Sequence, residues 1–117
     1  MNAPVLVEGT RDAAALRKLG VRGRILTLNR GQGLLRRCEV LAREHGRVIL
    51  LTDWDLKGRE LHERLKKLLA ACGGVPDETF WLALRRLCGG SNRTIEELPS
   101  FLRNLRETAG VASPIDS

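Results

Sequence analysis

Three short apolar runs stand out in the first half of the chain. They cover residues 5–7, 25–28 and 48–51, consist mainly of valine, isoleucine and leucine, and are bounded by turn or charged residues. Apolarity that is continuous rather than alternating is typical of strands covered on both faces, as in a parallel sheet. We therefore expect three buried, parallel strands.

Helical patterns follow each of these runs. Each pattern has apolar residues at helical spacing, and each is followed by a glycine. The predicted helices cover residues 12–19, 34–45 and 57–72. Strand alternating with helix in this way predicts an α/β fold whose helices cover a parallel sheet.

The last third of the chain is less regular. Pro76 opens a further helical pattern, residues 89–92 have the composition of a loop, and Thr94-Ile95 is predicted to form a short fourth strand. Pro99 begins a last helix, and the length predicts one domain over residues 1–107, followed by a flexible tail at 108–117.

Composition narrows the functional classes. The net charge of +6 and a pI near 10.0 favour a polyanionic partner such as nucleic acid. The chain has no tyrosine, and its two histidines exclude a three-histidine metal site. No apolar run is long enough to span a membrane, and we expect no export signal. Three cysteines without a close pair suit a reducing cytoplasm.

Acidic residues directly follow two of the predicted strands. Glu8 comes after the run at 5–7, and Asp53 and Asp55 come after the run at 48–51. Because sites in parallel sheets form beyond the carboxyl ends of the strands, we expect the three carboxylates at one edge. Two carboxylates about 6 Å apart repel by roughly 3 kcal/mol at an effective dielectric constant of 20. A divalent cation offsets that repulsion, and a set of oxygen ligands favours Mg²⁺ or Mn²⁺.

The Asp-x-Asp pair also has a simpler interpretation. Both residues can be solvated turn residues, or Asp55 can cap the next helix. Two features favour the metal site: Glu8 belongs to a separate strand and precedes a glycine, and Gly58 lets the backbone approach a ligand. Trp54, between the aspartates, is expected to pack against the next helix rather than stack on a base. Of two adjacent aromatic residues, Phe80 is expected in the core and Trp81 partly exposed.

Basic residues near these acids can contact phosphate groups. Lys57 and Arg59 lie beside the Asp-x-Asp pair, Arg11 follows Glu8, and Arg30 follows the second strand. For Arg11 and Arg30 a surface role is an equally good interpretation. The remaining basic residues of the third predicted helix are expected to form a solvated face: Arg64, Lys66 and Lys67.

Two segments together resemble the Toprim domain, which topoisomerases, bacterial primases and ribosomal-RNA-maturing ribonucleases share. They are VLVEGTRD at 5–12 and LLTDWDLKG at 50–58, and the resemblance covers about residues 4–72. The local sequence around Glu8 is most similar to that of the maturation ribonucleases and of small stand-alone Toprim proteins. The resemblance implies a three-layer α/β fold with a mainly parallel sheet of about four strands and helices on both faces.

The resemblance also implies roles for single residues. Glu8 matches a metal ligand or general acid/base, and Asp53 and Asp55 match the metal-binding aspartates of the family. The supporting positions of the motifs are matched by Gly9, Asp12, Gly58 and the turn Asn29-Arg30-Gly31.

The chain departs from two branches of the family. A topoisomerase needs a tyrosine nucleophile, and a primase needs a zinc module and a further subdomain, so we expect neither activity from this chain alone. The prediction is a cytoplasmic nuclease that uses Mg²⁺ or Mn²⁺ to cleave RNA or DNA. A homodimer or a larger processing complex stays open.

Two alternatives belong to other functional classes. One is a non-catalytic nucleic-acid-binding module or subunit. The other is a phosphoacceptor receiver domain with Asp53 as the acceptor. The receiver also requires paired acids after the first strand and a lysine after a fifth strand, and the sequence shows neither.

Overall fold

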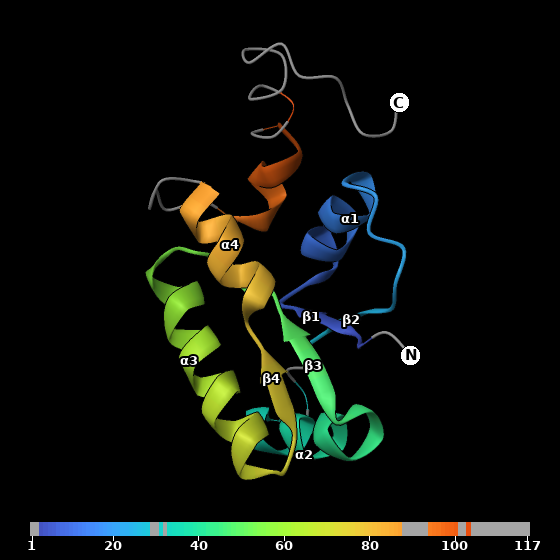
Figure 1. Ribbon diagram of the computed structural model, residues 1–117, viewed down its shortest axis with the longest axis vertical. Helices are drawn as coiled ribbons and strands as arrows, with labels where there is room; N and C mark the ends of the chain where they lie inside the picture. Colours follow the sequence, from blue (N-terminus) through green and yellow to red (C-terminus); the bar gives the residue numbers. More distant parts are fainter. Residues whose placement is uncertain (1–2, 29–30, 32, 88–93, 101–102, 104–117) are drawn as a thin grey trace.

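The computed structural model describes residues 3–28, 31, 33–87, 94–100 and 103. Four strands form one sheet (Figure 1): β1 (Val5–Val7), β2 (Ile25–Thr27), β3 (Arg47–Leu50) and β4 (Val75–Asp77). The helical elements are α1 (Thr10–Lys18), α2 (Leu34–His45), α3 (Leu56–Ala71), α4 (Thr79–Leu87) and the 3₁₀ helix η1 (Ile95–Glu97).

All strand pairs of the sheet are parallel, and the strand order is β2-β1-β3-β4. In the central strand β1, Val5 lies opposite Ile25 of β2 on one side and Ile49 of β3 on the other. The carboxyl ends of β1 and β3 are therefore neighbours. This register brings the residues that follow the two strands, Glu8 and Asp53, to the same edge of the sheet.

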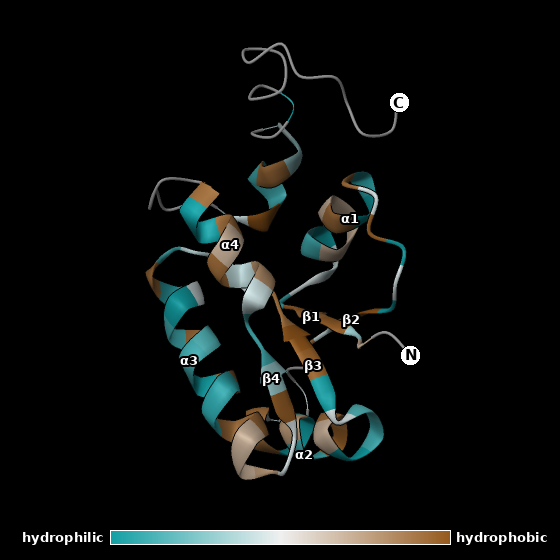
Figure 2. Ribbon diagram, in the orientation of Figure 1, coloured by the Kyte–Doolittle hydropathy of each residue, from teal (hydrophilic) through white to brown (hydrophobic). Residues whose placement is uncertain are grey.

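Helices cover both faces of the sheet. Val5 and Val7 contribute to a buried cluster with residues of α1, α4 and η1, whereas Leu6 between them joins a cluster with residues of α2 and α3. This division follows from the alternation of side chains along a strand. Figure 2 shows β3 hydrophobic over most of its length, because both of its faces are covered. The predicted three-layer α/β fold is confirmed.

The fourth strand lies elsewhere than the sequence pattern predicts. Pro76 and Asp77 were expected to open a helix, but residues 75–77 pair with β3 as an edge strand, where Pro76 needs no hydrogen-bonded N–H on its outer side. Asp77 forms an ion pair with Arg47 of β3, which fixes this pairing. The predicted strand at Thr94-Ile95 is wrong, since Ile95 is buried at the start of η1, which packs beside α1.

The adjacent aromatic residues of α4 have the opposite exposure to the one predicted. Trp81 is 4% exposed and Phe80 is 53% exposed. The indole N–H of Trp81 donates to the carbonyl of Thr52 at 2.9 Å, and the indole N–H of Trp54 donates to the carbonyl of Trp81 at 3.0 Å. Burial of Trp81 satisfies its polar atom while its rings fill the core. Trp54 is 2% exposed, so it packs in the core and offers no surface to a base. Its ring stacks with that of Trp81 in α4, whereas the expected partner was the next helix along the chain, α3.

Several predicted features lie outside the described residues. They are Asn29, Arg30, the loop at 89–92, most of the helix expected after Pro99, and the tail at 108–117. Among the helices that the structure describes, none has the length and apolarity needed to cross a membrane.

Candidate metal and nucleic-acid site

The turn after β1 holds two acidic side chains close together. Glu8 directly follows the strand and is partly exposed. Asp12, in the first turn of α1, accepts a hydrogen bond through Oδ2 from the backbone N–H of Gly9 at 3.0 Å. Burial and the nearby charge of Glu8 raise the pKa of Asp12. The two carboxylates therefore interact across this turn.

Asp53 enters the same region from β3. Its Oδ1 accepts a hydrogen bond from the backbone N–H of Ile95 at 2.8 Å. Burial raises the pKa of Asp53 to about 6, and the charges of Asp12, Asp55 and Glu8 add to this rise. No lysine or arginine in the described part of the chain forms an ion pair with Asp53. A cation at this carboxylate would therefore relieve repulsion that the protein itself leaves unbalanced.

Asp55 has a structural task at the start of α3. Its Oδ1 accepts a hydrogen bond from the backbone N–H of Gly58 at 2.8 Å, which caps the helix. The hydroxyl of Thr52 donates to the carbonyl of Gly58 at 2.9 Å and closes the same turn. A Cβ atom at Gly58 would collide with the backbone carbonyl of Asp53. The lack of a side chain at Gly58 thus allows the backbone of Asp53 to pass close to α3. The predicted role of Gly58 beside a ligand stays a prediction.

An open pocket of about 470 Å³ unites the acidic residues. We call it the acidic pocket, and its charged and hydroxyl-bearing lining residues are Glu8, Thr10, Arg11, Asp12, Asp53, Thr94 and Glu96. Asp55 does not line it. Two of the three carboxylates predicted as ligands therefore share one pocket, and the third caps the helix beside it. Thr94 and Glu96 were not predicted, because only the docking of η1 against α1 brings them here.

The donor set of the acidic pocket can be compared with the needs of a metal ion. Within the described residues, no group of three or more acidic, histidine or cysteine side chains is placed to hold an ion together. Mg²⁺, however, keeps several waters and is commonly bound through one or two carboxylates plus phosphate oxygens of a substrate. Glu8 and Asp53 fit that requirement, since both supply oxygen and both face this pocket.

The predicted basic residues are distributed unevenly around the acids. Arg11 lines the acidic pocket. Lys57 is exposed and Arg59 partly buried in the first turn of α3, and the described lining of the pocket includes neither. Gly31 is exposed beyond β2. Of the predicted phosphate-binding residues that the structure describes, Arg11 is therefore the one that the fold places at the acids.

His62 of α3 lies apart from the acids. It is fully buried, and its ring stacks on that of Trp81 with 3.8 Å between the ring centroids. Glu78 Oε1 lies 3.7 Å from Nε2 of His62. Burial lowers the pKa of His62, while Glu78 opposes this effect. The imidazole thus acts as a core group of the α3–α4 packing.

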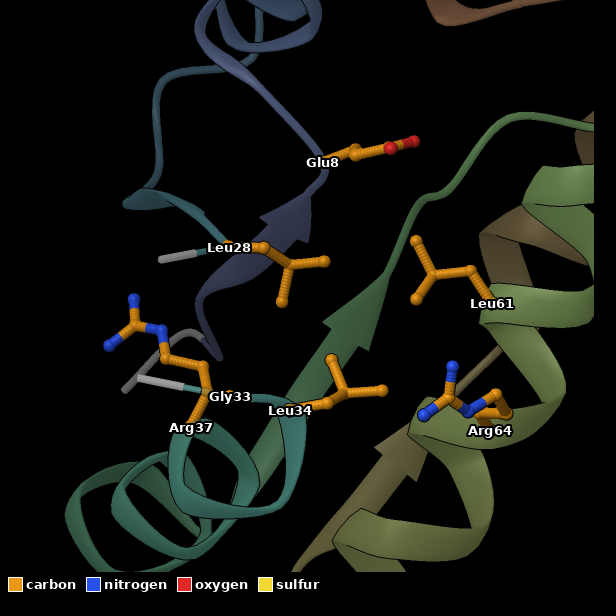
Figure 3. Close-up of a pocket in the computed structure, with 7 residues that line it drawn as sticks. All are labelled: Glu8, Leu28, Gly33, Leu34, Arg37, Leu61 and Arg64. Carbon is orange, nitrogen blue, oxygen red and sulfur yellow. The ribbon is translucent and has the colours of Figure 1, made fainter. Parts of the chain in front are cut away.

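A second cavity, of about 270 Å³, shares Glu8 with the acidic pocket (Figure 3). We call it the α2–α3 cavity, and it is also lined by Leu28, Gly33, Leu34, Arg37, Leu61 and Arg64. Arg37 was not predicted as a site residue, and Arg64 is exposed, as expected for a solvated face, but also lines this cavity. A signal was present, because α2 and α3 each carry a Leu-x-x-Arg pair, and residues three apart share a helix face.

Comparisons with known proteins agree with this architecture. The Toprim domain family matches residues 3–78. A UPF0292 protein of Thermoplasma volcanium is 37% identical over 97 residues, which cover 83% of this chain and 80% of that protein. A UPF0292 protein of Methanosarcina barkeri is 32% identical over 97% of this chain and 79% of its own length. A solved structure of a putative protein from Aquifex aeolicus superposes with a TM-score of 0.68 at 32% identity, covering 81% of this chain and 83% of that one.

Proposed function

Because the chain belongs to the Toprim family, we propose that it is a nuclease, which cleaves phosphodiester bonds of RNA or DNA with Mg²⁺ or Mn²⁺. Family membership supports metal binding and an association with nucleic acid in general terms. The observation that carries the proposal is the convergence of Glu8 and Asp53 from neighbouring parallel strands in one pocket, where no described basic side chain pairs with Asp53.

In this proposal Glu8 and Asp53 hold the ion, which when bound would stabilise charge on the phosphate oxygens and promote ionisation of the attacking water. Glu8 lines both cavities, and in this proposal its carboxylate accepts the proton that the attacking water loses. Asp53 must be ionised to act as a ligand. Since burial and neighbouring acids raise its pKa to about 6 in the metal-free protein, we expect the affinity for the metal ion to rise with pH through that value.

Other residues support the reaction by positioning. Arg11 holds a phosphate of the substrate at the acidic pocket, and exposed Lys57 contacts the flanking strand. Asp55 keeps the turn before α3 in place through its bond to Gly58, and its charge helps to raise the pKa of Asp53. The net charge of +6 favours binding that weakens with added salt.

The test is cleavage of end-labelled RNA and DNA, in Mg²⁺, in Mn²⁺ and in EDTA. We expect metal-dependent cleavage by the wild type and a loss of at least 100-fold in Glu8→Gln and Asp53→Asn, within the range of a single acid/base contribution. Glu60→Gln is the matched control, because Glu60 is an acid of α3 outside both cavities. Equal activity of all four proteins would overturn the proposed site.

A second function, nucleic-acid binding without cleavage, is favoured by one observation. Asp55, which was predicted as a metal ligand, is engaged as a helix cap and does not line the acidic pocket. Salt-sensitive binding without turnover in either metal would support this binding module and contradict the nuclease.

A further inference from the structure

The α2–α3 cavity has the chemistry of a binding site rather than of a packing defect. Its walls are apolar, with Leu28 and Leu34 on one side and Leu61 on the other, and Figure 3 shows these side chains pointing toward one another across the opening. Two cationic side chains, Arg37 and Arg64, complete its rim. Leucines that face an open space flanked by cations suit a ligand with a flat apolar body and negative charge.

The two arginines differ in how they are held. Arg37 donates from Nη2 to the carbonyl of Thr27 at 3.1 Å, which fixes it at the end of β2. Its buried Nε has no hydrogen-bond partner within the described residues. Arg64 is exposed on α3, and Figure 3 shows its guanidinium group on the cavity side of this helix. One cation is thus fixed in place, and the other is free to follow a ligand.

The start of α2 adds to the positive potential. Gly33 and Leu34 line the cavity, and Gly33, which is the N-cap residue of α2, has no side chain to cap the backbone N–H groups at this end of the helix. Uncapped N–H groups and the helix dipole favour an anion at such a position. The cavity therefore offers an apolar slot next to three sources of positive potential.

Glu8 connects this cavity to the acidic pocket, because it lines both. A strand whose phosphate lies at Glu8 and Asp53 would therefore pass one of its neighbouring nucleotides over the cavity. A base can enter an apolar slot only when it is unpaired, and flipped or unpaired bases are commonly held between aromatic or apolar side chains.

We propose that the α2–α3 cavity binds one unpaired base next to the phosphate at the acidic pocket, so that the substrate is single-stranded or locally unpaired. This inference rests on the proposed function. Leu28, Leu34 and Leu61 contact the base, while Arg64 and the start of α2 contact the adjacent phosphate. The contact with the base distinguishes unpaired from paired nucleic acid, and the contacts with phosphate supply affinity that does not depend on sequence.

The experiment compares two fluorescent single-stranded oligonucleotides that differ at one central position, which carries either a base or an abasic site. Binding is measured by anisotropy in Mg²⁺ over a salt series, with all linkages made phosphorothioate to slow cleavage. We expect the wild type to bind the complete strand about tenfold more tightly, because burying the base between the leucines removes apolar surface from water. A duplex of the same sequence should bind more weakly than the complete single strand.

Three variants separate the two kinds of contact. Leu61→Asn should lose the preference for the complete strand. Arg64→Ala should weaken both oligonucleotides alike and reduce the salt slope by about one charge. Arg43→Ala is the control, because Arg43 is an arginine of α2 that lines neither cavity.

The outcomes are distinct for the two proposals. Equal affinity of the wild type for the complete and abasic strands, with cleavage intact, would overturn the base site and leave the nuclease standing. The same holds if folded Leu61→Asn keeps the wild-type preference. Absence of salt-sensitive binding to any strand would overturn the proposed function itself.

Discussion

Replacing Asp53 by asparagine should stabilise the protein in metal-free buffer at neutral pH. The carboxylate is ionised at pH 7.5 although burial and three neighbouring acids raise its pKa from 3.8 to about 6. A rise of this size corresponds to about 3 kcal/mol at about 1.4 kcal/mol per tenfold change in proton affinity. Since water reaches part of the Asp53 side chain, we expect Asp53→Asn to gain only about 1–2 kcal/mol in the free energy of unfolding.

The neutral amide removes the repulsion and keeps the structural contact. The side-chain oxygen of the asparagine in Asp53→Asn can still accept the hydrogen bond that the backbone N–H of Ile95 makes to Asp53 at 2.8 Å. The direction in which stability changes with pH follows from the raised pKa of Asp53. Between pH 3.8 and about 6 the folded wild type binds a proton that the unfolded chain does not, so its stability rises as pH falls through this window. Asp53→Asn should lack that rise.

Urea unfolding followed by tryptophan fluorescence measures this effect, because Trp54 and Trp81 are buried. In EDTA at pH 7.5 the variant should unfold at higher urea than the wild type. Millimolar Mg²⁺ or Mn²⁺ should stabilise the wild type and not the variant. A variant less stable than the wild type in EDTA would refute the argument that Asp53 sits in unbalanced negative potential.

Three further predictions concern the surroundings of the site. Gly58→Ala should lower the free energy of unfolding by about 2 kcal/mol in urea titrations, because the new methyl group collides with the backbone carbonyl of Asp53. Helix propensity alone predicts the opposite, a gain in stability, so a measured gain would contradict the packing described here. Asp55→Ala should cost about 1 kcal/mol by the same assay through the loss of the α3 cap, and Asp55→Asn should retain most of it; equal costs would argue against a cap. The wild type should lose stability as pH falls below 6.5, because burial lowers the pKa of His62 in the folded protein and the unfolded chain takes up the proton first. His62→Gln should reduce this loss. Parallel profiles of unfolding free energy against pH for the two proteins would contradict this.

Much of the fold could be predicted from local sequence. The continuous apolar runs of β1, β2 and β3 are typical of strands covered on both faces, and they form the centre and one edge of the sheet. The strand β4 could not be found in this way. Its three residues include an exposed valine and a proline, and its place depends on pairing with Arg47, far away in sequence.

The candidate site was predictable to the same extent. The meeting of Glu8 and Asp53 follows from parallel neighbouring strands that end at one edge. The engagement of Asp55 as a cap depends on how the turn closes against Gly58, which an Asp-x-Asp pattern does not determine. The arrival of Glu96 beside these acids depends on the packing of η1 against α1, for which the local sequence carries no signal.

The most direct test of the shared ion site is a crystal soaked in millimolar Mn²⁺, with the anomalous signal located. We expect a peak in the acidic pocket, within bonding distance of oxygens from both Glu8 and Asp53, and no such peak in Glu8→Gln. A pocket without a peak, or Mn²⁺ bound only at other carboxylates, would contradict it.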